Sequence, residues 1–239
     1  SDATKFVVEN MDNFDTIICS GGDGTLNEIT TGYMKVEKER RKPCGYIPAG
    51  TVNDFATSLG ISKNINKCVD QILDSSIFPY DIGEFGDRYF NYIAFTEVAY
   101  STSQSVKNML GKTAYILEGI KSLTKIKSAN VKIITENKTV EGNYIFGMIC
   151  NTFSVGGLLK IDRDDVSLDE AIFVKKPKNP IELQETLNDT LSGKLNSKHF
   201  EYFRSSNFRI ISEEPLNWTL DGEFGGKTDN VEIHNHERA

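Results

Sequence analysis

The stretch that most constrains this chain is residues 14–28, FDTIICSGGDGTLNE, in which an apolar run ends at a cluster of glycines. The apolar run predicts a β-strand, the glycines a tight turn, and the following residues the start of a helix. Thr25 and Glu28 have the spacing of a capping box, in which both side chains bind free amides at a helix N-terminus. The glycines would then lie where backbone amides converge, a site that attracts anions such as phosphate.

Asp23 in this loop indicates that a metal ion takes part. A carboxylate about 4 Å from a phosphate charge costs roughly 1 kcal/mol in water and about 4 kcal/mol near a protein surface. A magnesium ion between the two groups removes the repulsion, because both become its ligands. The loop therefore predicts metal-assisted phosphoryl transfer. A glycine-rich turn with an exposed aspartate stays open as the alternative, since short glycine motifs also occur by chance.

A second stretch, residues 44–60 (CGYIPAGTVNDFATSLG), repeats this pattern. Thr51 and Asp54 again have capping-box spacing, and Gly60 follows at the place where a helix often ends in a left-handed residue. In doubly wound sheets, ligands bind outside the carboxyl ends of the strands. Two helix N-termini are thus predicted to point at one ligand. The alternative is that Glu28 and Asp54 only cap their helices.

Together these motifs resemble the diacylglycerol kinase catalytic domain of soluble bacterial lipid kinases, to which sphingosine and ceramide kinases are related. The resemblance rests on GGDGT at 21–25, PAGTVNDFA at 48–56 and LDGE at 220–223, with weaker matches in FTEVAY, KNMLGKTAY, NTFSVGGL and SLDE. It covers nearly the whole chain. GGDGT alone also occurs in NAD kinases and phosphofructokinases, so its pairing with the other two motifs carries the specificity.

The resemblance implies an α/β fold joined to a β-rich one. Residues 1–80 would form a doubly wound nucleotide-binding domain like that of NAD kinases and diacylglycerol kinases, and residues 81–239 a C-terminal β-sandwich-like domain. The alternation of residues 85–95 and the segments VKIIT and YIFGMIC predict strands and a hairpin. Family members open with a further strand and an Asn-Pro-x-Ser-Gly loop that contacts nucleotide. We therefore expect further residues before Ser1 and within the loops at 91–96 and 168–172.

The resemblance also implies an active site that binds ATP and Mg²⁺ in the cleft between the domains. Asp23 and Asp54 would organise the magnesium and its water network, and Glu223 would be the general base that accepts the proton of a lipid hydroxyl. A sharp turn at Asp221-Gly222 would present Glu223 at a loop tip. The matched nucleotide contacts are Gly21, Gly22, Asp23, Gly24, Thr25, Leu26, Asn27, Glu28, Gly50, Thr51 and Asn53.

A second metal site is predicted in the acidic segment 162–170, DRDDVSLDE. Repulsion among its carboxylates would be relieved by a hard cation with oxygen ligands. In the family, the corresponding loop holds a structural magnesium through a carboxylate and backbone carbonyls. The match points to Asp169 and the carbonyl of Ser167, with Glu170 as a further candidate because the loop departs from the pattern after Asp169. A solvated acidic loop is the alternative.

Composition and charge limit the classes of partner that this protein can bind. A net charge of -7 argues against nucleic-acid binding. No apolar run approaches the roughly 18 residues of a membrane-spanning helix, and the absence of a signal peptide favours the cytoplasm. A lysine-rich predicted helix at about 103–125 would suit peripheral contact with an anionic membrane, although solvated helices are often lysine-rich too. The oligomeric state, a homodimer included, is left open.

The function predicted by the resemblance is phosphorylation of a lipid alcohol, with diacylglycerol converted to phosphatidic acid. Two alternatives remain at this point. One is a kinase for a soluble substrate, similar to NAD kinase, which the shared GGDGT loop favours. The other is a catalytically silent regulator that binds lipid or nucleotide, which the departures in the loops would allow.

Overall fold

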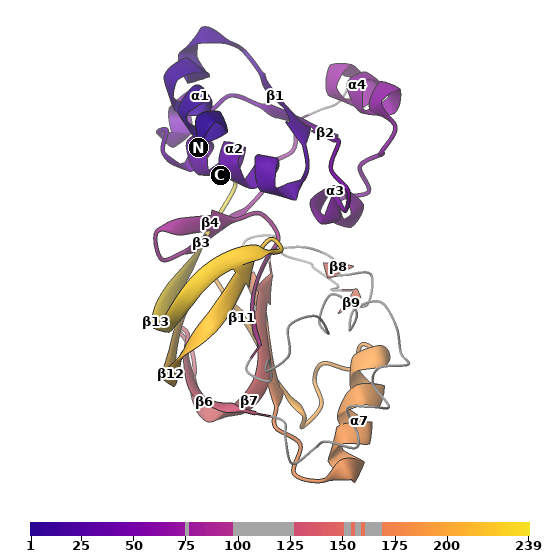
Figure 1. Ribbon diagram of the computed structural model, residues 1–239, viewed down its shortest axis with the longest axis vertical. Helices are drawn as coiled ribbons and strands as arrows, with labels where there is room; N and C mark the ends of the chain where they lie inside the picture. Colours follow the sequence, from indigo (N-terminus) through magenta and orange to yellow (C-terminus); the bar gives the residue numbers. More distant parts are fainter. Residues whose placement is uncertain (75–76, 98–126, 151–153, 156–158, 161–168) are drawn as a thin grey trace.

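The structure, a computed structural model, describes residues 1–74, 77–97, 127–150, 154–155, 159–160 and 169–239. These residues form two lobes (Figure 1): an α/β lobe of four helices and a small sheet, and a β-lobe built on a large antiparallel sheet. Both chain termini lie at the α/β lobe. The C-terminal residues are fastened there, because Ala239 N donates to Tyr80 O at 3.0 Å and Lys38 Nζ donates to Glu237 O at 2.7 Å.

The α/β lobe brings two strand-to-helix turns to one edge of its sheet. Its strands β1 (Ile17–Gly21) and β2 (Cys44–Pro48) are parallel, with Gly21 opposite Pro48 at their carboxyl ends. Since parallel strands end at the same edge, the chain that follows each strand starts from the same place. The helices are α1 (Asp2–Asn10), α2 (Asp23–Met34), α3 (Asp54–Ser58) and α4 (Ile65–Asp74), with short 3-10 turns at Met11–Asn13 and Lys38–Arg40.

Helix α4 has an apolar face that is only partly buried. Ile72 packs on Gly45 of β2, where a Cβ would lie 3.0 Å from it, and Cys68 is buried. Val69 and Leu73 are 39% and 76% exposed. The reason is geometric: α4 packs along β2, so only the side chains turned toward that strand leave solvent.

The β-lobe contains β3 (Ile82–Phe85), β4 (Arg88–Phe90), β5 (Ile93–Glu97), β6 (Ala129–Ile134), β7 (Thr139–Cys150), β10 (Asp169–Lys175), β11 (Phe200–Ser205), β12 (Asn207–Leu220) and β13 (Glu223–His236). The strand order is β11-β10-β7-β5-β12-β13-β3-β4, and β6 also pairs with both β7 and β12. Strands β5 and β6 thus lie at opposite ends of the space between β7 and β12. The hairpin predicted for VKIIT and YIFGMIC is confirmed as β6–β7. The short pair β8 (Ser154–Val155) and β9 (Leu159–Lys160) forms a separate sheet.

The large sheet buries side chains on both of its faces. One face carries an aromatic and aliphatic cluster that includes Trp218, Phe173 and Phe208. On the other face, Met148 and Ile172 join a cluster that continues into the α/β lobe. The two lobes are therefore connected through apolar packing as well as through polar contacts.

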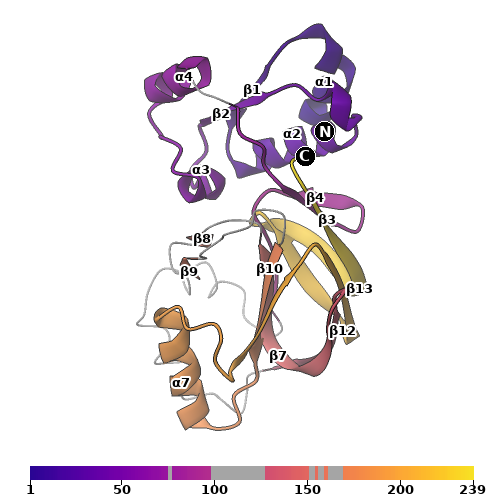
Figure 2. The ribbon, with the colours of Figure 1, turned by 180° about the vertical axis from the view of Figure 1, so that it is seen from behind.

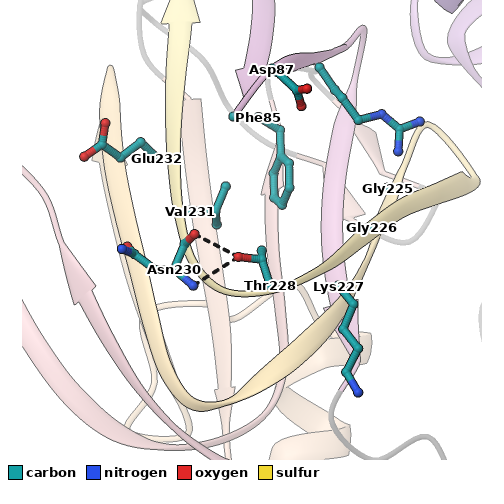
Figure 3. A pocket seen from close by; sticks show the side chains of 11 residues that line it. Phe85, Asp87, Gly225, Gly226, Lys227, Thr228, Asn230, Val231 and Glu232 are labelled. Atoms are coloured by element: carbon teal, nitrogen blue, oxygen red, sulfur yellow. Dashed lines mark hydrogen bonds between the residues drawn. The ribbon is translucent and has the colours of Figure 1, made fainter.

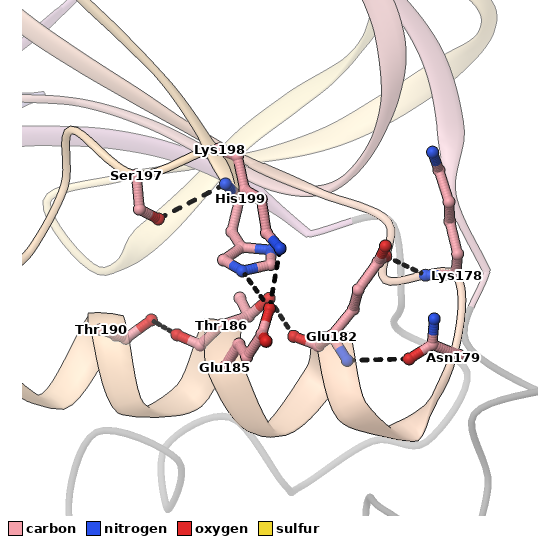
Figure 4. Close-up of polar contacts among 9 residues, drawn as sticks. All are labelled: Lys178, Asn179, Glu182, Glu185, Thr186, Thr190, Ser197, Lys198 and His199. Carbon is pink, nitrogen blue, oxygen red and sulfur yellow. Dashed lines mark hydrogen bonds and ion pairs between the residues drawn. The ribbon is translucent and has the colours of Figure 1, made fainter.

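Helix α7 (Pro180–Leu191) stands beside the β-lobe on the side away from β12 and β13 (Figures 1 and 2). Asn179 caps it, accepting from Glu182 N at 2.9 Å, and Glu182 Oε2 accepts from Lys178 N at 2.7 Å. Glu185 contacts His199 at 3.1 Å and Lys198 at 3.0 Å (Figure 4). His199 thus joins α7 to the start of β11. The lysine-rich helix predicted over 103–125 falls outside the described residues.

Candidate active site

The loops that follow β1 and β2 touch through two glycines. A Cβ added to Gly50 would lie 2.5 Å from Gly22 Cα, and one added to Gly22 would lie 3.2 Å from Gly50 Cα. Neither position tolerates a side chain without moving the other loop. The two glycine motifs found in the sequence therefore form one surface at the carboxyl edge of the small sheet.

Asp23 links the two loops. As the first residue of α2, it accepts hydrogen bonds from Asp54 N at 3.0 Å and Phe55 N at 3.1 Å, the first two residues of α3. A carboxylate that accepts from a helix N-terminus is stabilised by those amides and by the helix dipole. Asp23 is thus held in one orientation at the meeting point of the motifs.

Both predicted capping boxes are wrong. Helix α2 begins at Asp23, two residues before Thr25, and its N-cap Gly22 has no side chain to offer, while Leu26 N already donates to Gly22 O. Helix α3 begins at Asp54 instead of after Thr51, and Asn53 as its N-cap makes no side-chain cap bond. The free amides of α3 are bound by Asp23 from the other loop, which no local spacing reveals.

Asn53 shapes the loop after β2. Its backbone is left-handed, with a φ of 56°, and its side chain is 3% exposed. Asn53 Oδ1 accepts from Gly50 N at 2.9 Å and its Nδ2 donates to Gly50 O at 2.7 Å, so the side chain closes the loop on itself. Asparagine tolerates the left-handed region better than most residues. The predicted role of Asn53 in nucleotide binding would thus be exerted through loop shape.

Asp54 faces both Asp23 and the β-lobe. Its Oδ2 lies 3.4 Å from the hydroxyl of Tyr92, which comes from the connection between β4 and β5. Burial and the neighbouring carboxylate of Asp23 raise the pKa of Asp54, and the Tyr92 hydroxyl opposes this shift. Burial and the charges of Asp221 and Asp54 raise the pKa of Tyr92, so the hydroxyl stays protonated and donates. Asp23, predicted to act together with Asp54, is thus close enough to change the ionisation of Asp54.

Asp221 is the polar centre of the contact between the lobes. It is 4% exposed and accepts from Asn91 N (2.6 Å), Asn91 Nδ2 (3.0 Å), Tyr92 N (3.0 Å), Ile93 N (3.2 Å) and Asn27 Nδ2 (3.1 Å). Burial raises its pKa, while these donors favour the charged form. Because Asn27 lies one helical turn after Asp23 on α2, Asp221 fastens the β12–β13 turn to that helix.

The general-base candidate Glu223 follows Asp221 by two residues. Asp221 and Gly222 have φ values of 48° and 86°, and they form the tight turn that the sequence predicted between β12 and β13. Glu223 is the first residue of β13, and its side chain is exposed. The turn therefore presents Glu223 next to the residue that binds α2. Sequence reasoning gave Asp221 a place in this turn only, and its buried partners, which come from α2 and residues 91–93, had no local signal.

The remaining predicted nucleotide contacts divide into two groups. Gly24, Thr25, Glu28 and Thr51 are exposed along the loop after β2 and the first two turns of α2. Leu26 is 5% exposed and packs in the core with Ile29. A nucleotide contact by Leu26 would have to use its backbone, since its side chain is occupied in the core.

The predicted second metal site is described only in part. Ser167 and the side chain of Asp169 lie outside the described residues. Glu170 is 1% exposed on β10, and its Oε1 lies 3.7 Å from Arg204 Nε. In the described part of the chain its carboxylate faces the guanidinium of Arg204 and the hydroxyl of Tyr202. A metal role for Glu170 stays a prediction.

The loops after β1 and β2 suit a magnesium-bound phosphate. Within the described ranges, no three His, Cys, Asp or Glu side chains cluster closely enough to hold a metal by themselves. Mg²⁺ commonly uses one or two protein carboxylates and completes its coordination with water and substrate phosphates. Asp23 and Asp54, with mutual charge repulsion and a glycine surface beside them, match this donor set.

Comparison with known proteins identifies the family. A family described as the diacylglycerol kinase catalytic domain matches residues 1–85. A diacylglycerol kinase of Bacillus subtilis is 34% identical over 235 residues, which are 94% of this chain and 77% of that protein. The chain belongs to the diacylglycerol kinase family. The predicted enzyme class, a lipid kinase, is thereby confirmed.

Other diacylglycerol kinases agree in sequence and in fold. One from Staphylococcus saprophyticus is 31% identical over 236 residues, covering 95% of this chain and 76% of that protein. A crystal structure of a diacylglycerol kinase from Bacillus anthracis has a TM-score of 0.76 and 26% identity, covering 98% of this chain and 79% of that one. The predicted fold class is therefore confirmed. Among the described residues, no helix combines the length and apolar character that a membrane span needs.

Proposed function

We propose that this member of the diacylglycerol kinase family transfers the γ-phosphoryl group of ATP, in a Mg²⁺-dependent reaction, to the hydroxyl of diacylglycerol, giving phosphatidic acid. The observation that carries the proposal is the contact of the two glycine loops through Asp23, which also approaches Asp54. Backbone amides and glycines without side chains offer the phosphates close approach. The relatives named diacylglycerol kinase supply the substrate class.

In the proposed reaction the lipid hydroxyl oxygen attacks the γ-phosphorus, a new O–P bond forms, and the bond to the β-phosphate oxygen breaks to release ADP. Asp23 and Asp54 would hold Mg²⁺, which would neutralise phosphate charge when bound. Glu223, on the hairpin tip beside α2, would accept the hydroxyl proton. Because the acceptor is a membrane lipid, the protein would contact a membrane surface during turnover.

The test measures transfer of labelled phosphate from ATP to diacylglycerol in mixed micelles, with and without Mg²⁺, for the native protein and Glu223→Gln. We expect labelled phosphatidic acid only with Mg²⁺. We expect turnover of Glu223→Gln to fall on the order of a hundredfold or more, as for loss of a general base. Equal turnover by folded Glu223→Gln would refute the assigned base. Transfer to NAD but not to diacylglycerol, or binding of ATP without any transfer, would overturn the substrate or the activity.

A further inference from the structure

The tip of the β12–β13 hairpin has an irregular backbone directly after Glu223. Thr219 pairs with Phe224 but Trp218 pairs with Gly226, so Gly225 is an extra residue on β13. Such a bulge interrupts the regular ladder of hydrogen bonds. The Phe224 side chain is 66% exposed, so packing of its ring does little to hold the tip. The position of Glu223 therefore depends on other contacts.

Apart from the bond from Asn27 of α2, those contacts come from one neighbouring segment, residues 88–93. Before Glu223, the Asp221 carboxylate accepts from the backbone amides of residues 91, 92 and 93. After Glu223, Arg88 Nη1 donates to Phe224 O at 2.9 Å. The residues on both sides of Glu223 are thus bonded to the stretch that runs from β4 into β5.

The two contacts differ in their surroundings. Asp221 is buried, whereas Arg88 is exposed at the start of β4, directly after the turn that joins β3 to β4. Arg88 lines a concavity of about 280 Å³ together with that turn and residues of β13, and none of the predicted site residues lines it. Asp87 and Lys227 lie at opposite ends of this concavity (Figure 3). Arg88 can therefore be changed without opening the core, and Lys227 is a second cation that lines the same concavity.

We propose that Arg88 and Asp221 are positioning residues that hold Glu223 against α2. This inference rests on the proposed function, in which Glu223 is the base. Asp221 sets the distance of the tip from α2 through Asn27, and Arg88 fixes the backbone that follows Glu223. Proton transfer needs the carboxylate within hydrogen-bond reach of the hydroxyl, and displacements of about 1 Å can cost on the order of a hundredfold in rate.

The experiment compares Arg88→Ala, Arg88→Lys and Lys227→Ala in the diacylglycerol kinase assay, with KM for ATP and Tm measured for each. We expect Arg88→Ala to lower kcat by about tenfold, with KM for ATP and Tm nearly unchanged, because nucleotide binding and the core are untouched. Arg88→Lys keeps a donor and should recover most of kcat. Lys227→Ala, the matched control, should retain native kcat. Asp221→Asn should lower kcat as well, with a fall in Tm.

Two outcomes would overturn the positioning role while the proposed function stands. In one, Glu223→Gln is inactive but Arg88→Ala keeps native kcat. In the other, Arg88→Ala lowers Tm and kcat together and Arg88→Lys restores neither, which marks a structural role only. If Glu223→Gln itself keeps native turnover, the base assignment fails and the positioning role fails with it.

Discussion

The carboxylate of Asp23 binds the backbone amide of Asp54 at 3.0 Å, although the two residues are 31 positions apart in the sequence. A residue predicted to anchor magnesium therefore also caps the helix that carries the second predicted acid. This double role gives Asp23 consequences for stability that a surface metal ligand would not have.

Asp23→Asn should abolish lipid kinase activity and also lower stability. One carboxylate oxygen becomes an amide nitrogen, which cannot accept from Asp54 N or Phe55 N. We expect turnover to fall by at least about a hundredfold, and the free energy of unfolding to fall by about 1 to 2 kcal/mol, as for loss of a helix cap. Urea denaturation and the micelle assay measure the two effects. Asp70→Asn, on the exposed face of α4, is the control and should change neither.

Asp54→Asn should have opposite effects on activity and stability. Burial and the charge of Asp23 raise the pKa of Asp54, so ionised Asp54 destabilises the metal-free fold near neutral pH. A raised carboxyl pKa gives stability that is fully present below the ordinary pKa and is lost as the pH rises through the folded value. The neutral variant should therefore melt at a higher temperature at pH 7 without Mg²⁺, and show lower turnover. A lower Tm at pH 7 would contradict this explanation.

Gly50→Ala should separate the two loops. Its Cβ would lie 2.5 Å from Gly22 Cα and 2.7 Å from Asn53 Oδ1, so both loops must shift. We expect a loss of about 1 to 3 kcal/mol of stability and a large loss of activity.

Gly24→Ala provides the contrast, since its Cβ would meet nothing within 4 Å. In the first turn of α2, alanine should keep or slightly raise stability, by up to about 1 kcal/mol. If phosphate approaches this backbone, KM for ATP should rise. Calorimetry of ATP binding and thermal melting measure the two changes, and unchanged ATP affinity would place the phosphate elsewhere.

Glu136 should make the β-lobe sensitive to acid. Ser205, Ser206 and Asn207 donate to its carboxylate, and the hydrogen bond from Ser205 is the main cause that lowers its pKa to about 2 from 4.5. A depressed pKa gives stability that is present above 4.5 and is lost as the pH falls toward 2. Glu136→Gln should therefore be less stable than the native protein at pH 7, with a smaller difference near pH 2. Melting curves across this range test it, with Glu214→Gln as the control.

Much of the fold could be predicted because its signals are local. Alternating residues mark the strands around Phe85 and the β6–β7 hairpin, and Gly60 ends α3 with a φ of 67° as expected. The LDGE segment is a tight turn because Asp221 and Gly222 accept positive φ values. In each of these cases, residues that are close together in the sequence determine the local conformation without a distant partner.

The sequence by itself determined the family, the glycine loops after two strands, and the hairpin that carries Glu223. Only the tertiary structure decided which groups those loops bind. Asp23 caps α3, and Asn27 reaches Asp221 across 194 positions, because backbone donors and buried carboxylates take whichever partners folding brings near. Spacing along the chain predicts hydrogen bonds within a turn, but partners from distant segments depend on how the two lobes pack.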